Sequence, residues 1–168
     1  MSIPWPMIGA VALPVASGSL SGYLVREGTR DWYESLKKPD WKPPKIAFSI
    51  VWPALYSGMG YASYLVWKEG GGFHGAAQLP LAAYGTQLAL NVAWSPVFFG
   101  KKSIKGGLIT IGLLDAAVVA TTYLFYQVTP TAAYIMLPYV AWLAYATALN
   151  HRVWRDNPQP SITEVKGQ

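Results

Sequence analysis

Five stretches of the chain are long, apolar and almost free of charged residues. They cover residues 4–25, 46–67, 79–100, 106–128 and 132–154. An α-helix needs about 20 apolar residues to cross a hydrocarbon layer of about 30 Å, so each stretch has the length of one membrane span. The pattern predicts an all-α integral membrane protein, a five-transmembrane-helix bundle that forms a single domain over residues 1–157.

Two polar segments flank these stretches. Residues 26–45 form a charged cap between the first two helices, rich in proline, tryptophan and tyrosine. A loop of this length inside a compact domain is usually functional or disordered, and fixed-φ prolines and bulky aromatics argue against disorder. We therefore expect a cytosolic cap loop that closes a pocket in the bundle. Residues 158–168 are polar, and we expect a flexible C-terminal tail.

The composition restricts the class of protein. Hydrophobic residues make up 52% of the chain and charged residues only 12%, whereas about a quarter of an average soluble domain is charged. The chain has no cysteine and two histidines, His74 and His151, predicted near opposite faces. This excludes a thiolate metal site, and we expect no metal site at all. The net charge of +5 comes without a nucleic-acid-binding motif, so we expect no nucleic-acid partner.

The basic residues are distributed unevenly between the two sides of the predicted bundle. The 68–78 turn, the 128–132 turn and the N-terminus together hold one basic side chain, Lys68. The opposite side holds twelve: Arg26, Arg30, Lys37, Lys38, Lys42, Lys45, Lys101, Lys102, Lys105, Arg152, Arg155 and Lys166. Because lysine and arginine stay on the cytoplasmic side, the cap and the C-terminus are predicted to face the cytosol. The same groups could also hold anionic membrane lipids.

Polar and aromatic residues recur at helical spacing. Gln87, Asn91, Trp94 and Ser95 share one face of the third helix, and an unpaired amide in lipid costs about 2–7 kcal/mol, so this face points into the bundle. Similar faces occur on the second and fifth helices: Ser49, Trp52, Tyr56, Gly60 and Ser63, and Trp142, Tyr145 or Ala146, and Leu149. Each could simply join helices, but together they predict a cavity for a flat apolar molecule.

Two further features concern packing. Gly18 and Gly22 form a Gly-x-x-x-Gly pair, for which we expect a closely approaching helix. Asp115 lies inside the fourth predicted helix. An acid in a membrane span is a functional candidate, but we favour a neutral carboxyl that is hydrogen-bonded to another helix.

The order and spacing of several tryptophan-anchored motifs resemble the translocator protein family, also known as peripheral benzodiazepine receptors or tryptophan-rich sensory proteins. The resemblance covers residues 5–157. The motifs are Trp32-Tyr33, Leu36, Lys38-Pro39, Trp41 and Pro43-Pro44; Val51-Trp52, Leu55-Tyr56, Met59-Gly60 and Tyr64 to Trp67; Gln87 to Asn91, Ala93-Trp94, Pro96 and Phe98 to Gly100; and Ala141 to Ala144, Leu149-Asn150 and Trp154-Arg155.

The resemblance implies a five-helix protein, in animals mostly of the mitochondrial outer membrane. It implies binding of cholesterol or another sterol, of protoporphyrin IX or haem, and of synthetic benzodiazepine-site ligands, with a role in lipid and tetrapyrrole transport and no required cofactor. The implied ligand-binding positions are Gly22, Val25, Tyr33, Phe48, Ser49, Val51, Trp52, Asn91, Trp94, Trp142, Ala146 and Leu149.

Two other functions stay open. Trp52 and Trp142 match a pair implicated in porphyrin degradation by bacterial relatives, which implies a light-dependent oxidative enzyme in which these two residues are the catalytic candidates. The third function is a membrane scaffold or sensor. Binding is favoured because the sequence supplies neither a redox cofactor site nor an acid–base pair.

The sequence departs from the family in three places. The sterol-recognition motif needs a tyrosine, but the segment from Leu149 to Arg155 carries His151 and Arg152 where animal members have tyrosines. Gly106 stands where mammalian members have a tryptophan. The dimer motif of the third helix is reduced to Ala82-x-x-x-Thr86, so a homodimer is left open.

Overall fold

The computed structural model describes residues 2–158, and the predicted tail lies outside them except for Pro158. Within this range the chain is all-helical and has no strand. The elements are α1 (Trp5–Leu24), α2 (Arg30–Ser35), α3 (Lys45–Glu69), α4 (Gln78–Ser95), a π-helical turn η1 (Pro96–Gly100), α5 (Ile104–Val128) and α6 (Pro130–Asp156). The all-α prediction is confirmed.

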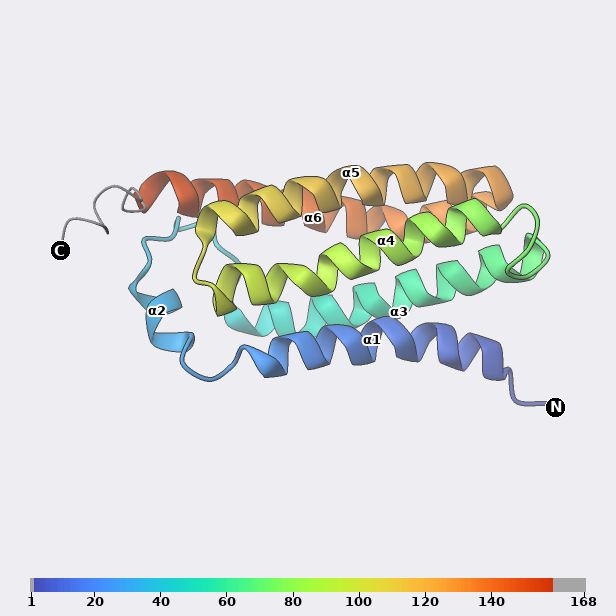
Figure 1. Ribbon diagram of the computed structural model, residues 1–168, viewed down its shortest axis with the longest axis horizontal. Helices are drawn as coiled ribbons and strands as arrows, with labels where there is room; N and C mark the ends of the chain where they lie inside the picture. Colours follow the sequence, from blue (N-terminus) through green and yellow to red (C-terminus); the bar gives the residue numbers. More distant parts are fainter. Residues whose placement is uncertain (1, 159–168) are drawn as a thin grey trace.

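The five long helices run side by side, and short α2 lies at one end of the bundle (Figure 1). In cross-section α1 contacts α3 and α4, α3 also contacts α6, and α5 joins α4 to α6. The helices therefore close a ring around a common interior. Helix α1 begins at one end of the bundle, and α6 finishes at the other, beside α2 (Figure 1).

Three helices, α1, α5 and α6, are long and apolar enough to span a membrane by length and composition. Helix α3 has 25 residues and therefore a length of about 37 Å at about 1.5 Å per residue. Helix α4 has only 18 residues, because Pro96 ends its regular hydrogen bonding.

The helix predicted over residues 79–100 changes its form at Pro96, the residue expected to kink that helix or fray its end. Pro96 has no N–H, so the carbonyl of Val92 loses its helical donor. The hydroxyl of Ser21 in α1 donates to this carbonyl instead, at 2.7 Å. The chain then continues as the wider π-helical turn η1. The α4 carbonyl that Pro96 leaves without a donor is thus satisfied by a serine of α1, as membrane helices require.

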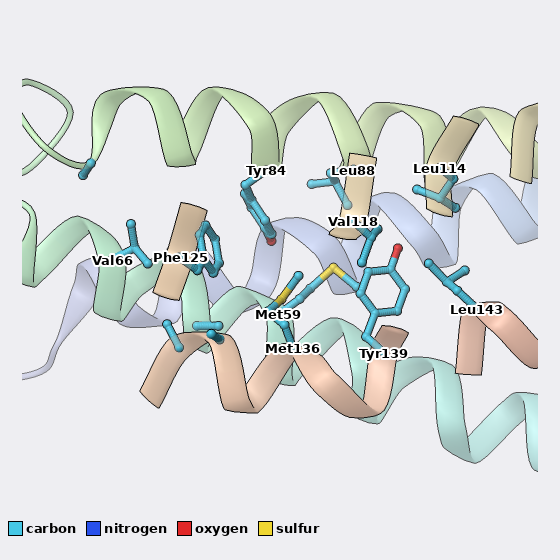
Figure 2. Close-up of a cluster of buried hydrophobic side chains, with 14 of the residues drawn as sticks. Met59, Val66, Tyr84, Leu88, Leu114, Val118, Phe125, Met136, Tyr139 and Leu143 are labelled. Carbon is cyan, nitrogen blue, oxygen red and sulfur yellow. The ribbon is translucent and has the colours of Figure 1, made fainter. Parts of the chain in front are cut away.

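The hydrophobic core fills the half of the bundle farthest from α2. Figure 2 shows its side chains, contributed by α3, α4, α5 and α6, and its largest fully buried members include Met59, Phe125 and Tyr139. In α3 the buried residues lie in the second half of the helix, from Met59 to Val66. Because one half is filled with side chains, any large interior space must lie in the other half.

The segment predicted as a cap loop contains the short helix α2, which the sequence analysis did not predict. Trp32 and Tyr33 of α2 pack edge-on against Phe98 and Phe99 of η1, with ring centroids 5.6 and 5.5 Å apart. Phe98, in turn, belongs to a small buried cluster with Ile104 and Val153. Aromatic contacts of this kind fix α2 over the end of the bundle.

Two polar contacts hold the rest of the cap to α6. The Asn157 side chain accepts from the Lys37 N–H at 2.9 Å and donates to the Lys37 carbonyl at 2.8 Å. The Tyr145 hydroxyl donates to the Trp41 carbonyl at 2.6 Å. Both contacts satisfy backbone groups of the cap that take part in no helical hydrogen bond.

Replacing Asn157 by alanine is expected to loosen the cap without unfolding the bundle. The substitution removes two hydrogen bonds to the Lys37 backbone. Loss of about 1–1.5 kcal/mol from this contact should make local opening of the cap roughly tenfold faster. Amide hydrogen exchange across residues 36–42 measures this opening. His151→Ala, on the exposed side of the same helix end, is the matched control. Equal exchange rates in the two variants would contradict the role of Asn157 in holding the cap to the end of α6.

Candidate functional site

A cavity of about 1450 Å³ occupies the half of the bundle next to α2. Its walls come from the second half of α1, the cap, the first half of α3 and the last turns of α4, with smaller contributions from α5 and α6. The helices carry small or aromatic residues at the α2 end of the bundle, and the cavity lies there. The close-packed core occupies the opposite end. The size of the cavity suits a ligand of several fused rings.

Aromatic side chains form much of the cavity wall. Phe48 and Trp52 lie on α3, Trp94 on α4, and Phe99 on η1. Trp94 is stacked on Phe98, with ring centroids 4.7 Å apart, and its indole N–H donates to Asn150 at 3.2 Å. This fixes the orientation of the ring, so the wall presents a preformed apolar surface to a ligand.

A chain of hydrogen bonds forms the floor. The Tyr56 hydroxyl donates to the Asn91 side-chain oxygen at 2.7 Å, and the Asn91 amide donates to the Tyr139 hydroxyl at 2.7 Å. The Tyr139 hydroxyl then donates to Gln87 at 3.0 Å. Tyr56 and Asn91 line the cavity, whereas Tyr139 and Gln87 are buried beneath it. The inward direction predicted for Gln87 and Asn91 is confirmed.

The mouth of the cavity is charged. Glu34 of α2 accepts hydrogen bonds from Lys45 at 2.8 Å and from Arg30 at 3.4 Å. The hydrogen bond from Lys45, followed by that from Arg30, holds the pKa of Glu34 below its usual range. The Lys38 ammonium donates to the carbonyls of Tyr33 at 2.6 Å and Leu36 at 3.0 Å. Desolvation by partial burial is the largest cause of the lowered pKa of Lys38.

The comparison with known proteins decides the family. Residues 10–155 match the TspO/MBR family. This chain belongs to that family. It is 48% identical over 159 residues to the translocator protein of Homo sapiens and 46% identical over 159 residues to that of Bos taurus, with 94% of both chains covered in each case. It is 33% identical over 157 residues to the tryptophan-rich sensory protein of Cereibacter sphaeroides, with 94% of this chain and 95% of the relative covered.

The resemblance seen in the motifs is therefore confirmed, and the protein is an integral membrane protein of the TspO/MBR family. Of the positions that the resemblance implied for ligand binding in this TspO/MBR protein, nine line the cavity: Gly22, Val25, Tyr33, Phe48, Ser49, Trp52, Asn91, Trp94 and Ala146.

Val51, Trp142 and Leu149 are not among the lining residues. Val51 is rotated about 100° around α3 from Trp52. Trp142 lies behind the wall, with its ring 6.5 Å from that of Trp52 and 5.9 Å from that of Phe48. Leu149 packs instead against the Phe98 cluster under α2. Trp142 can therefore position the wall, but in this structure a ligand would meet Trp52 first.

The structure corrects one packing expectation for the TspO/MBR chain. Gly18 does allow a close approach, because a Cβ there would overlap with the Tyr56 ring of α3. Gly22, however, has no atom within 4 Å of a Cβ position and faces the cavity. Of the Gly-x-x-x-Gly pair, Gly18 therefore allows a helix contact and Gly22 forms part of the cavity wall.

Sequence reasoning missed other residues of the site. Arg26 and Lys42 line the mouth, and Ile111 and Leu114 of α5 line the interior. Lys42 lies between Trp41 and Pro43 in the cap, which is a signal in the sequence, whereas Arg26 lies between Val25 and Glu27 and has no such neighbours. The sequence analysis assigned both residues to the topology on their charge alone. For the last two, an apolar periodicity does not distinguish a cavity wall from a core.

The remaining predicted residues lie outside the cavity. His151 and Arg155 are exposed, and Arg152 and Arg155 pair with Asp156 at 2.6 and 3.5 Å. The degenerate sterol segment is thus a charged helix end. Thr147 of α6 donates to Asp115 of α5 at 2.7 Å, so the expected hydrogen bond to another helix is confirmed.

Proposed function

We propose that this protein is a membrane receptor or carrier that binds flat, largely apolar molecules in the cavity under its cap. The ligand classes are cholesterol or another sterol, porphyrins such as protoporphyrin IX or haem, and synthetic benzodiazepine-site ligands. The observation that supports this most is the aromatic-walled cavity of about 1450 Å³. The names of relatives, translocator protein and tryptophan-rich sensory protein, point to transport or sensing.

The proposed setting is a membrane crossed five times, by α1, α3, α4, α5 and α6, with the C-terminus in the cytosol. Among the described residues, Lys68 is the only lysine or arginine in the segments at the end of the bundle away from α2, and eleven others lie in the segments at the α2 end. This asymmetry supports a cytosolic cap. We propose the mitochondrial outer membrane as the location, which is what the family resemblance implies for animal members.

A second candidate function is the light-dependent oxidation of a bound porphyrin by dioxygen. The observation that favours it is the edge-to-face contact between Trp52 and Trp142, with ring centroids 6.5 Å apart and planes at 87°. The two indoles could pass an oxidising equivalent from the cavity wall to the interior. The third candidate, a scaffold or sensor acting through partner proteins, has no comparable structural support.

Protoporphyrin IX is expected to quench the tryptophan fluorescence of the purified protein in lipid nanodiscs saturably, and to be recovered intact. Trp52→Ala removes a wall of the cavity and is expected to weaken binding roughly tenfold, which corresponds to about 1.4 kcal/mol. Trp5→Ala is the control, because Trp5 is 68% exposed at the start of α1 and does not line the cavity.

The same samples separate the candidates. The enzyme requires the porphyrin absorption band to disappear in light and in air, and requires Trp142→Phe to prevent that loss. Unsaturable quenching that is equal in the wild type, in Trp52→Ala and in Trp5→Ala would contradict binding in this cavity.

A further inference from the structure

A second hollow lies on the outside of the bundle, between α1 and α3. It has a volume of about 540 Å³ and shares no lining residue with the cavity under the cap. Five residues of α1, from Met7 to Val15, line one side, and Ser57 and Tyr61 of α3 line the other. Ile8 is 43% exposed and Tyr61 is 39% exposed, so this α1–α3 groove opens toward the surroundings of the bundle.

The walls of the groove are almost entirely apolar. The five α1 residues are aliphatic or methionine. On α3, the Ser57 hydroxyl already donates to the Pro53 carbonyl at 2.8 Å, and Tyr61 adds an aromatic ring. A polar group placed in the groove would lose its water and gain few partners, which is costly. The part of a ligand that fits here is therefore a hydrocarbon chain.

The groove covers one half of the membrane thickness. Ser57 is the middle residue of α3, and the α1 lining runs from Met7, near the start of that helix, to Val15, near its middle. The start of α1 lies at the end of the bundle opposite α2 (Figure 1). In the proposed five-span setting, the groove therefore runs from the middle of the bilayer to the surface away from the cap, and the acyl chains of that leaflet surround it.

A stripe of residues on α3 leads from the groove to the end of the helix. Ser57, Tyr61, Tyr64 and Lys68 follow one another at i, i+4, i+7 and i+11, which places them on one face. The Tyr64 ring lies 6.2 Å from that of Tyr61 and is stacked on that of Trp67, also at 6.2 Å. Tyrosine and tryptophan collect at the boundary between hydrocarbon and headgroups. The stripe thus ends in a lysine at the depth of the lipid phosphates.

The length of this stripe matches one leaflet. Eleven residues separate Ser57 from Lys68, a rise of about 16 Å at about 1.5 Å per residue, and half of the hydrocarbon layer is about 15 Å. Lys68 is exposed and, within residues 2–158, takes part in no ion pair. Glu69 follows it directly, but adjacent residues of a helix do not face each other. The Lys68 ammonium is thus available to an anionic headgroup.

We propose that the α1–α3 groove binds one acyl chain of a phospholipid from the leaflet opposite the cap, and that Lys68 binds the phosphate of the same lipid. The apolar walls fit the chain, and a single lysine at the end of the stripe fits a single phosphate. The inference rests on the proposed five-span setting and not on the ligands of the cavity under the cap. Porphyrin binding can therefore fail while the inference stands.

Photolabelling tests where the chain lies. The probe is a phosphatidylglycerol with a diazirine at the end of one acyl chain, added to the purified full chain in an uncharged sugar detergent. Peptide mass spectrometry is expected to find the label on residues 11–15 and 57–61, about tenfold above residues 109–113 of α5, because a chain in a groove buries roughly two more methylene groups than one on a flat helix face. Ile109 and Leu113 are the matched reference, since both are 57% exposed and line neither the groove nor the cavity.

Ala12→Phe fills the groove from the α1 side and is expected to lower the labelling of residues 57–61 about tenfold. Ala12 is exposed and lines the groove. Ala16→Phe is the matched control, because Ala16 lies one turn further along α1 and is also exposed, but lines neither the groove nor the cavity. This control should keep the labelling of the wild type. Thermal unfolding of both variants checks that the bundle is intact.

Competition tests the role of Lys68. Unlabelled phosphatidylglycerol is expected to displace the probe about two- to fivefold better than a diacylglycerol with the same chains, which is the size of one exposed ion pair. Lys68→Gln should remove this difference. Lys101→Gln removes the same charge from the α2 end of the bundle and should keep the difference.

Four results would overturn the inference. The first is a label spread evenly over the exposed helix faces, and the second is a groove label that Ala12→Phe leaves unchanged. The third is displacement of the probe by cholesterol or by a second copy of the chain more readily than by phosphatidylglycerol. The fourth is an equal preference for phosphatidylglycerol in Lys68→Gln and Lys101→Gln, which would leave the phosphate without its proposed partner.

Discussion

Replacing Gly60 by alanine is expected to lower the free energy of unfolding by about 1–3 kcal/mol, the cost of adding a methyl group where no space exists. Gly60 of α3 packs against the backbone of α1. A Cβ there would overlap with the carbonyl oxygen of Ala10 and would lie 2.7 Å from the Cα of Val11. Backbone atoms cannot rotate aside as a side chain can, so α1 must shift. Because α1 forms one wall of the cavity, porphyrin binding should weaken as well.

Gly112→Ala is the matched control. Gly112 lies in the middle of α5 and has no atom within 4 Å of a Cβ position. Both substitutions add the same methyl group. Both also gain the same helix propensity, which favours alanine over glycine by about 1 kcal/mol. The difference in thermal unfolding between the two variants, measured in the same detergent, therefore isolates the contact with α1. Equal unfolding temperatures would show that α1 does not depend on Gly60.

Tyr139→Phe is expected to have the second large effect, a loss of about 1–3 kcal/mol from two buried groups left without partners. The Tyr139 hydroxyl accepts from Asn91 at 2.7 Å and donates to Gln87 at 3.0 Å. Tyr139 is 1% exposed and Gln87 is fully buried, so water cannot replace the hydroxyl. In a membrane the unfolded helices also find partners, which brings the expected loss toward the lower end of the range.

The effect of Tyr139→Phe should extend to the cavity. Asn91 also accepts from Tyr56 at 2.7 Å, so the floor loses one of the contacts that orient it. Tyr134→Phe is the control, since Tyr134 lies on the same helix and is 61% exposed. Thermal unfolding and protoporphyrin titration of the two variants measure both effects. A Tyr139→Phe protein as stable as Tyr134→Phe would contradict the role of the buried hydrogen-bond chain.

The sequence predicted the helical class and the direction of the main polar face, because both follow from local physics. An amide such as Gln87 must be buried among protein atoms in a membrane helix. The five apolar stretches also lie close to the bounds of the long helices. Pro96 marked where the regular α4 helix ends, but not the π-helical form of the turn that begins there. The helix α2 was missed, since six residues between prolines and charges give too little periodicity to detect.

The site was only partly accessible from the sequence. The aromatic and small residues of α3 predicted a cavity, but a helical period cannot tell which of two neighbouring residues faces it, as Val51 and Trp52 show. Trp142 matched a family motif and yet lies behind the wall. Arg26 and Lys42 line the mouth of the cavity, and only the three-dimensional arrangement of the cap reveals this.

Pro14 of α1 and Pro96 directly after α4 have a consequence for how the protein assembles after insertion into the bilayer. Pro14 deprives Ala10 of its helical donor, so α1 alone in lipid would expose an unsatisfied carbonyl, at the place that Gly60 of α3 later covers. Pro96 leaves a similar defect at Val92, and Ser21 fills it from a helix synthesised earlier. Packing of α1 against α3 therefore shields the Ala10 carbonyl from lipid, and packing of α4 against α1 gives the Val92 carbonyl a donor. Both prolines are thus tolerated in the assembled bundle rather than in the separate helices.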